Sequence, residues 1–302
     1  MSPSDRYSGR VESDGGASPL TPQSSPVLGY DRLRTQVSAQ TPAGVRLRLE
    51  LSDRDIGVLT SIQAFRLLQV EQVRRLHFTD HQTTEASKRI CRRVLQRLHD
   101  RDLLHRLERR VGGIRAGSSG HVYALAPVGH RLLGGTRRRR RSEPSLGFVQ
   151  HTLAIAEIAT RLIAEAPERG VEILDVSPEP FCWRHPIGTA TKTASTAIVK
   201  PDLHIVVADP GTELNWFIEV DCGTEAPTTI AKKCRVYTDY FRSGAEQKVT
   251  GIFPKVLWIA PDENRRALIE RAIKRDGIEP ALFETTIFDR ALEAITDAGG
   301  TP

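Results

Sequence analysis

Three acidic residues in the second half of the chain have the types and the spacing of a metal site. Glu219 and Asp221 stand two apart in the run NWFIEVDC (215–222), and Asp202 opens the apolar run PDLHIVVA (201–208). Because side chains alternate along a strand, Glu219 and Asp221 would share one face, and Asp202 would join them if the two runs pair. Clustered carboxylates repel one another unless a hard cation such as Mg²⁺ binds them, and bound Mg²⁺ orients phosphate and activates water. These three residues are therefore predicted metal ligands and catalytic residues.

The ordinary alternative is that these acids lie at an exposed strand end, where they need no partner. Two acids in a run flanked by WFI and V make that alternative awkward, since alternate residues of such a strand face inward. We therefore expect a magnesium site, and the alternative stays open.

The elements that would position these acids follow from hydrophobic periodicity. Strand-like runs cover 171–177, 201–208, 215–222 and 255–260, and helical patterns cover 146–166, 226–244 and 262–274. The order is helix, three strands, helix, strand, helix. It predicts an α/β sandwich for the unit 146–298.

Residues 46–135 form a separate predicted unit. The pattern gives a helix after Ser52, a short second helix, and a third helix in TTEASKRICRRVLQRLHDRD (83–102). The runs LLHRLERR (103–110) and HVYALA (121–126) are strand-like and enclose a Gly/Ser-rich excursion. Three helices followed by a hairpin is the order of a winged helix-turn-helix domain.

The third helix of this unit has an apolar face and a basic face. Ala86, Ile90, Val94 and Leu98 recur every four residues and predict the buried side. The predicted DNA-binding residues lie on the opposite face and in the hairpin: Lys88, Arg89, Arg92, Arg93, Arg97, Arg110 and Arg115. An α-helix fits the major groove of B-DNA, and arginine binds both phosphate and the edge of guanine, so double-stranded DNA is the predicted partner. The ordinary alternative is a solvated helix face, but compensating acids at i+4 spacing are lacking and the hairpin follows at once.

Charge is concentrated in the same part of the chain. The 302 residues carry a formal net charge of +6, yet between Lys88 and Arg141 there are 16 basic residues and only three acidic ones. A basic block in an otherwise acidic protein is typical of a phosphate-binding module. The five arginines 137–141 belong to a predicted linker, 136–145, which either binds phosphate or only separates the two units.

The remaining features exclude several classes of protein. Residues 1–45 are rich in Ser, Pro and Gly and are predicted to be disordered. Four cysteines without a CxxC pair favour neither a zinc site nor a disulfide framework. Neither an apolar leader nor a run of 18 uncharged apolar residues is present, so we expect a cytoplasmic protein that does not enter a membrane.

The second unit resembles the PD-(D/E)xK nuclease superfamily, which has a restriction-endonuclease-like α/β fold. The resemblance lies in Pro201-Asp202, a gap of 16 residues, and Glu219-Val220-Asp221. This similarity implies a nuclease-like domain after the winged helix.

A longer pattern resembles the replication-relaxation family of plasmids and mobile elements, over about residues 48–290. After the winged helix come His151-Thr-Leu, the Pro-Asp pair, the stretch FIEVDCGTE (217–225), and Lys233 four residues before Tyr237. The resemblance implies a role in plasmid replication, DNA relaxation or mobilisation, with DNA as the substrate and plasmid or mobile-element proteins as partners.

The chain departs from these patterns at several positions. The superfamily motif ends in lysine where this chain has Asp221, and Lys233 on the next helix is the candidate replacement. Glu157 matches an additional carboxylate that many such nucleases use as a metal ligand. Cys222 stands where the family favours arginine. His151 either contacts phosphate or has a local structural partner, and helix histidines more often have the latter.

Two functions follow. In the first, the protein nicks DNA with Mg²⁺ held by Asp202, Glu219 and Asp221, and Lys233 stabilises charge developing on phosphate. In the second, it is a non-enzymatic regulator or mobilisation accessory, whose degenerate nuclease domain serves for contact or for formation of a homodimer. The lysine missing from the motif favours the second function, and the intact acidic cluster favours the first.

Overall fold

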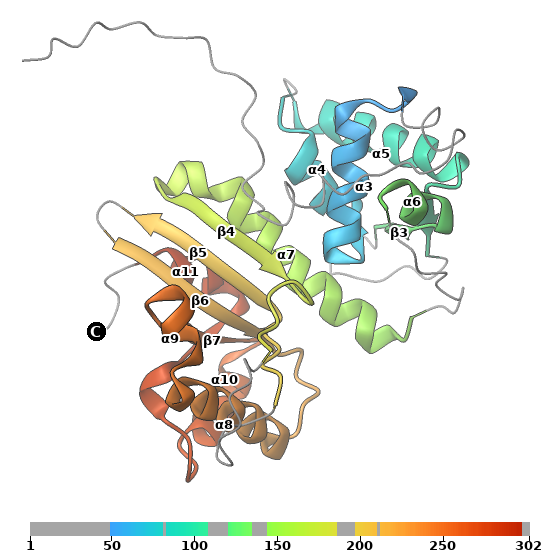
Figure 1. The fold of residues 1–302 in the computed structure, drawn as a ribbon. Helices are drawn as coiled ribbons and strands as arrows, with labels where there is room; N and C mark the ends of the chain where they lie inside the picture. Colours follow the sequence, from blue (N-terminus) through green and yellow to red (C-terminus); the bar gives the residue numbers. More distant parts are fainter. Residues whose placement is uncertain are drawn as a thin grey trace, which may run out of the picture.

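The computed structural model describes residues 49–80, 83–107, 120–134, 144–185, 197–209 and 212–297. They form a mixed α/β protein with two separate sheets, one of three strands and one of five (Figure 1). The mixed α/β class expected from the sequence is confirmed. The N-terminal tail 1–45, Arg110, Arg115 and the arginines 137–141 lie outside the described residues.

The first part of the described chain combines helices with the three-stranded sheet. Its elements are α3 (Asp53–Phe65), β1 (Leu68–Gln69), α4 (Val70–His77), α5 (Thr84–Asp100), β2 (Leu104–Arg106), β3 (Val122–Leu125) and α6 (Pro127–Leu132). The strand order is β1-β3-β2, and both pairings are antiparallel. Ser52 begins α3 as predicted, since its hydroxyl accepts a hydrogen bond from the Asp55 backbone and its own N–H donates to the Asp55 carboxylate.

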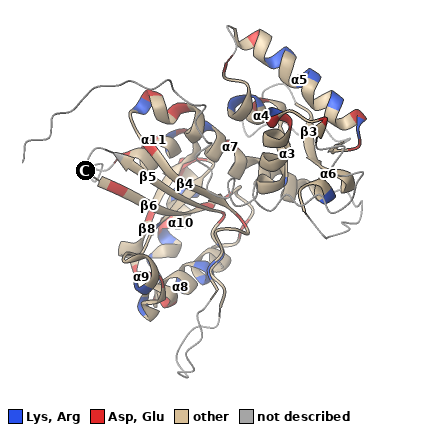
Figure 2. Cartoon of the chain, turned by 45° about the horizontal axis from the view of Figure 1, so that its top comes forward, with Lys and Arg blue, Asp and Glu red and all other residues tan. Residues whose placement is uncertain are grey.

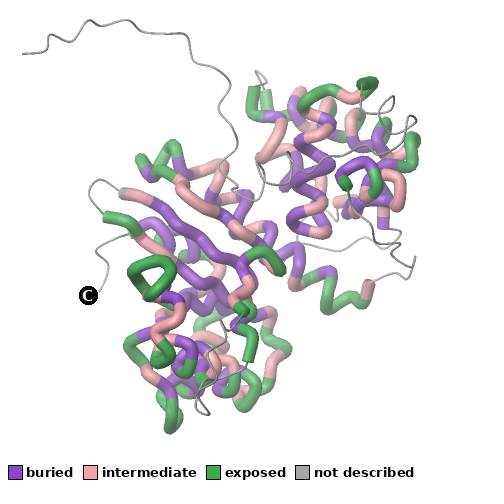
Figure 3. Tube along the Cα trace, in the orientation of Figure 1, coloured by how far each residue is buried: buried purple, intermediate pink, exposed green. Residues whose placement is uncertain are grey.

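The apolar face of α5 packs inward. Cys91, Leu95 and Leu98 are fully buried, and Ile90 and Val94 are half-buried against the same core. The predicted core face of this helix is confirmed. Its neighbours are α4 and β2, so the opposite face is left to solvent (Figure 3).

The second part is built on the five-stranded sheet. Its strands are β4 (Glu172–Pro178), β5 (Leu203–Asp209), β6 (Thr212–Val220), β7 (Lys255–Ala260) and β8 (Phe283–Ile287), in the order β4-β5-β6-β7-β8. Strands β4, β5 and β6 run antiparallel to one another, and β6, β7 and β8 run parallel. The runs 201–208 and 215–222 therefore pair, which is the condition on which the expected meeting of Asp202 with Glu219 depended.

Helices cover both faces of this sheet. They are α7 (Leu146–Arg169), α8 (Pro227–Ser243), α9 (Ala245–Thr250), α10 (Glu263–Ile273) and α11 (Ala291–Thr296), with short 3₁₀ turns at Pro280–Leu282 and Phe288–Arg290. Ile218 belongs to a core with α7 and α11, whereas its neighbour Phe217 belongs to a core with α8 and α10. Successive side chains of β6 thus point to opposite faces of the sheet and contribute to two apolar layers.

The two parts of the chain are in direct contact. Leu67 and Val122 of the first part form an apolar cluster with Val149 and Leu153 of α7. Helices α4 and α7 also pack against each other. This long helix therefore belongs to the sheet core on one side and to the interface between the parts on the other.

The sequence patterns missed β1, α6, α9, β8 and α11. Strand β8 has the sequence FETTI, in which polar residues predominate, because it is the edge strand and only Phe283 and Thr286 are buried. The other missed elements are a strand of two residues and three short helices, and each contains too few residues for a hydrophobic period to be recognised. None of the described helices is long and apolar enough to span a bilayer.

Candidate functional site

Helix α5 presents a row of exposed arginines. Thr83 caps its N-terminus through a hydrogen bond from Ala86 N to the Thr83 hydroxyl. Arg89, Arg92 and Arg93 are exposed, and none of the three forms an ion pair with another described residue. Figure 2 shows basic positions spaced along this helix on its outer side. These three guanidinium groups are available to bind an anion.

Two other basic residues predicted to bind DNA already have acidic partners. Lys88 pairs with Glu85 one turn earlier on the exposed surface, with an N–O distance of 3.0 Å. Arg97 pairs with the buried carboxylate of Asp55 at 2.5 Å. Asp55 belongs to α3, far from Arg97 in sequence, so spacing along α5 alone could not reveal the pair. Arg97 is therefore a stabilising contact of the first part of the chain rather than a free cation.

Asp202 and Glu219 are adjacent at one end of the five-stranded sheet. Leu203 lies opposite Ile218 in the antiparallel ladder, and the ladder continues with a hydrogen bond of 3.0 Å from Asp202 N to Ile218 O. The Asp202 carboxylate also accepts a hydrogen bond from Val220 N at 2.8 Å. The register therefore brings these two predicted ligands together at the carboxyl end of β6.

Glu219 is buried and has two partners on α8. The Tyr237 hydroxyl donates to one of its oxygens at 2.6 Å, and Lys233 Nζ donates to the other at 3.1 Å. Lys233 and Tyr237 are one turn apart, which places both on the face of α8 that covers the sheet. Lys233 also pairs with Glu225 at 2.8 Å. The lysine that sequence comparison proposed as a replacement therefore does reach the acidic cluster.

The pKa values of this pair reflect burial and mutual charge. Burial raises the pKa of Glu219 to about 7, although the positive charge of Lys233 acts in the opposite direction. Burial by itself would lower the pKa of Lys233, but the negative charges of Glu219 and Asp202 and the contact with Glu225 outweigh it, and the pKa rises above its ordinary value. Lys233 is a firmly protonated cation.

Asp221 is neutralised by an arginine that the sequence patterns did not single out. Arg265, in the first turn of α10, donates two hydrogen bonds to the Asp221 carboxylate and one to the carbonyl oxygen of Glu225 at 2.6 Å. Gly223 N, at a residue with φ +83°, donates to the same carboxylate at 3.0 Å. The side chain of Asp221 is fully buried, so the carboxylate depends on these donors.

His151 connects α7 to Asp202. Its Nε2 lies 3.2 Å from the second Asp202 oxygen, and its Nδ1 lies 3.9 Å from the Cys222 sulfur. Burial lowers the pKa of His151, but the hydrogen bonds with Asp202 and Cys222 outweigh this effect and raise the pKa to about 10. Of the two interpretations of His151, the one with a local partner has the support of this geometry.

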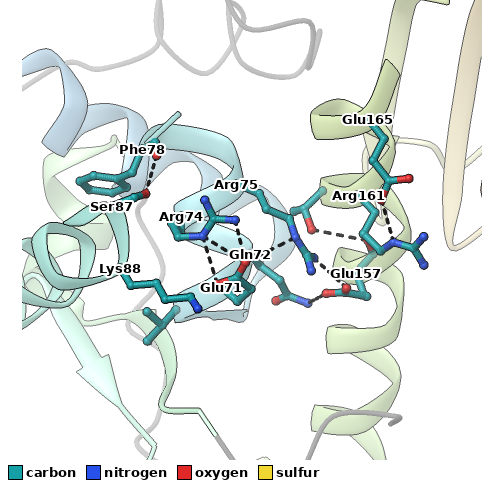
Figure 4. A network of polar contacts seen from close by, with 12 residues as sticks. Glu71, Gln72, Arg74, Arg75, Phe78, Ser87, Lys88, Glu157, Arg161 and Glu165 are labelled. Carbon is teal, nitrogen blue, oxygen red and sulfur yellow. Dashed lines mark hydrogen bonds and ion pairs between the residues drawn. The ribbon is translucent and has the colours of Figure 1, made fainter. Parts of the chain in front are cut away.

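Glu157, the fourth predicted metal ligand, takes part in a different contact. It lies two turns further along α7 than His151 and accepts hydrogen bonds from Gln72 Nε2 at 3.2 Å and from Arg75 at 2.7 Å, both on α4 (Figure 4). Gln72 is buried and also donates to the Leu153 carbonyl oxygen at 3.0 Å. The six residues from His151 to Glu157 span about 9 Å along the helix axis, which separates Glu157 from the acidic cluster. Glu157 contributes to the interface between the two parts rather than to a metal site.

A second polar contact between the parts lies next to Asp202. Arg66, at the end of α3, pairs with Glu179 at 2.9 Å, and Glu179 N donates to the Asp202 carbonyl oxygen at 3.0 Å. Burial raises the pKa of Glu179, and the nearby charge of Asp202 adds to this effect. This pair could not be predicted from the sequence, because the two residues lie in different units and in segments without periodicity.

The three carboxylates do not form a ready magnesium site. All six of their oxygens accept hydrogen bonds from the protein, with Val220 N, His151, Tyr237, Lys233, Gly223 N and Arg265 as donors. Within the described residues, no group of three or more His, Cys, Asp or Glu side chains is arranged to hold a metal ion. Magnesium prefers near-octahedral oxygen ligands and would have to displace bound cationic side chains here. The donor set therefore does not fit this ion.

Replacing Glu219 by glutamine is expected to remove a pH dependence of stability. The folded pKa of about 7 lies above the ordinary value of 4.5, so the Glu219 contribution is complete below pH 4.5 and is lost as the pH rises to 7. The loss amounts to about 3 kcal/mol, at about 1.4 kcal/mol per pKa unit. Urea unfolding of wild type and Glu219→Gln at pH 5 and pH 8 measures it. Glu284, half-exposed and paired with Lys255, supplies the control Glu284→Gln, and equal pH slopes for wild type and Glu219→Gln would contradict the assignment.

Comparison with known proteins places the chain in a family. The family model for replication-relaxation matches residues 59–256, a segment that contains α4, α5, α7 and the cluster of Asp202, Glu219 and Asp221. No curated protein and no solved structure gives a significant match. The resemblance noted in the sequence is confirmed, and since the match covers more than half of its length, the chain belongs to the replication-relaxation family.

Proposed function

We propose that this protein binds duplex DNA through α5 and acts in the replication or relaxation of a plasmid or mobile element. The observation that carries the proposal is the exposed row of Arg89, Arg92 and Arg93, which have no acidic partner among the described residues. An unpaired cluster of guanidinium groups on a solvent-facing helix costs stability through mutual repulsion, and bound phosphates would relieve it. Family membership supports the biological role.

The surrounding elements support a winged-helix assignment for this part. Helices α3, α4 and α5 precede the β2–β3 hairpin, and the short β1 between α3 and α4 completes its sheet. In a winged helix the last helix before the hairpin enters the major groove. The 17 residues of α5 extend about 25 Å at 1.5 Å per residue, which is long enough to cross the groove and reach a phosphate backbone.

The second part is best interpreted as a nuclease-like domain that contacts DNA without cleaving it. The carboxylates of the cluster are held by Lys233, Arg265 and His151, so the protein supplies the positive charge that a metal would otherwise bring. Buried ion pairs of this kind are costly to break because separation leaves an uncompensated charge. The cluster then fixes the ends of β5 and β6 and their helices in place.

Metal-dependent nicking is the second candidate function, and one observation favours it. Asp202 and Glu219 lie side by side with Lys233 bound to Glu219 at 3.1 Å, which brings together two acids and a lysine as the nuclease resemblance implies. Asp221 does not belong to this set, because Arg265 binds both of its oxygens.

A plasmid assay separates the two candidates. Incubation of the full chain with supercoiled plasmid and Mg²⁺ or Mn²⁺ is expected to give protein–DNA complexes and no open-circular product. The measurement is agarose electrophoresis after removal of the protein, alongside a gel shift without that step. Nicked product that disappears with Asp202→Asn would establish the second candidate, and the absence of any shifted complex would refute DNA binding.

A further inference from the structure

We propose that Phe181, Trp183 and Lys200 form a contact site for single-stranded DNA next to the acidic cluster. We call these three residues the aromatic–lysine cluster. The proposal rests on the proposed function, which supplies DNA as the ligand, and it adds a second point of contact that is distant in sequence from α5.

A short antiparallel bridge brings Trp183 and Lys200 together next to the turn that carries Phe181. Arg184 pairs with Val199 through two backbone hydrogen bonds of 2.9 and 3.0 Å. Trp183 and Lys200 are the next residues of the two bridged segments. Lys200 Nζ lies 4.6 Å from the centroid of the Trp183 ring. Phe181 stands two residues before Trp183, so their Cα atoms are at most about 7 Å apart. The bridge thus places the Lys200 ammonium group over the Trp183 ring, two residues along the chain from Phe181.

The cluster is accessible and its cation is unpaired. Phe181 is 47% exposed, more than any other described aromatic residue. Lys200 is exposed and forms no ion pair with another described residue. Two acids from the neighbouring segments are occupied elsewhere, since Glu179 pairs with Arg66 and Glu246 pairs with Arg184. A ligand at this surface would meet an apolar ring and a net positive charge.

This combination matches the chemistry of a single strand. An exposed aromatic ring stacks on unpaired bases of any sequence, and a neighbouring lysine binds the phosphate backbone. A duplex offers its phosphates but keeps its base faces stacked inside, so it could use Lys200 but not Phe181. DNA relaxation and replication both produce single-stranded segments, which fits the proposed role.

The turn that carries Phe181 is tied to the segment that carries Asp202. The Cys182 thiol donates to the Pro201 carbonyl oxygen at 3.0 Å, and Glu179 N donates to the Asp202 carbonyl oxygen at the same distance. A strand bound on the aromatic–lysine cluster would therefore run beside the acidic cluster.

Binding of labelled (dT)₂₀ to the full chain, followed by fluorescence anisotropy, tests the proposal. Phe181→Ala is expected to weaken binding by about 5- to 150-fold, the range for loss of one base–aromatic stack. Lys200→Ala is expected to reduce the slope of log affinity against log salt by about 0.7. The double variant Lys248→Ala/Val249→Ala removes an exposed cation and an exposed apolar side chain on α9 and is expected to bind like wild type.

Tryptophan fluorescence provides a local readout. The chain has three tryptophans, of which Trp216 and Trp258 are buried while Trp183 is half-buried. Titration with (dT)₂₀ is expected to quench emission in wild type and to leave it unchanged in Trp183→Phe. Affinities of Phe181→Ala and Lys200→Ala equal to wild type, or quenching that persists in Trp183→Phe, would overturn the proposal.

The same measurements separate this proposal from the proposed function. Duplex binding is measured in parallel with a labelled 20-base-pair DNA, in wild type and in Arg92→Ala/Arg93→Ala. Loss of (dT)₂₀ binding in Phe181→Ala with duplex binding intact supports the aromatic–lysine cluster. If wild type does not bind duplex but (dT)₂₀ binding still depends on Phe181, duplex docking by α5 fails and the single-strand site stands. Equal weakening of both ligands in Phe181→Ala would show a general structural defect and overturn the site.

Discussion

Arg265→Met is expected to lower the free energy of unfolding by about 3–5 kcal/mol, the typical loss when one partner of a buried ion pair is removed. The Asp221 side chain is fully buried, and Arg265 donates two of the hydrogen bonds that its carboxylate accepts. Methionine fills much of the same volume, so the loss reports the charge rather than a cavity. Urea denaturation monitored by circular dichroism measures the change.

The neighbouring arginine provides the matched control. Arg266 pairs with Glu263 and Glu270 on the same helix at the protein surface, and Arg266→Met is expected to cost less than about 1 kcal/mol. The double variant Asp221→Asn/Arg265→Met removes both charges and should recover most of the lost stability. A loss for Arg265→Met no larger than for Arg266→Met would show that Asp221 does not depend on this partner.

The strand pairing at the acidic cluster could be predicted because period-two alternation is a local property. The runs 201–208 and 215–222 are each readable from their own residues, and a short connection makes antiparallel neighbours of them. The juxtaposition of Asp202 and Glu219 follows from that register. The apolar face of α5 could be predicted for the same reason, since every residue that defines it lies in one helix.

The charge partners could not be predicted because they depend on tertiary contacts. Asp55 and Arg97, like Asp221 and Arg265, are more than 40 residues apart and occupy separate elements. One signal was present in the second case. Since β6 and β7 are parallel, their carboxyl ends lie at the same end of the sheet. The helix that follows β7 therefore begins near Asp221, and Arg265 stands in its first turn. Periodicity alone does not tell which of the adjacent arginines 265 and 266 turns inward.

These partners change the interpretation of the acidic cluster. Three carboxylates in a sequence suggest a cation because their mutual repulsion needs compensation. In the structure, Lys233, Arg265 and His151 provide that compensation. The same residue pattern therefore supports a metal site or a network of ion pairs, and only the position of the basic residues decides between them. On α5 the position of the charges favours a ligand-binding surface, because Arg89, Arg92 and Arg93 have no such partners among the described residues.

Arg92→Ala/Arg93→Ala is expected to weaken duplex DNA binding by about 1–3 kcal/mol, or about 5- to 150-fold, if either arginine contacts a base. If both contact phosphate only, the slope of log affinity against log salt should fall by about 1.8, at about 0.9 for each contact. Both side chains are exposed on α5 and lie outside the buried core of this helix, so the fold should tolerate the change. Filter binding across a series of salt concentrations distinguishes the two modes.

The control for this prediction is an exposed arginine on another surface. Arg242, in the last turn of α8, is exposed and belongs to the second part of the chain. Arg242→Ala removes the same kind of charge and should leave affinity and salt slope nearly unchanged, since a charge beyond about 10 Å from the bound phosphates is largely screened at 0.1 M salt. Thermal midpoints of both variants within a few degrees of wild type would exclude unfolding as the cause. If Arg92→Ala/Arg93→Ala retains wild-type affinity and slope, α5 is not the DNA-binding surface, and the duplex would have to dock on another basic part of the chain.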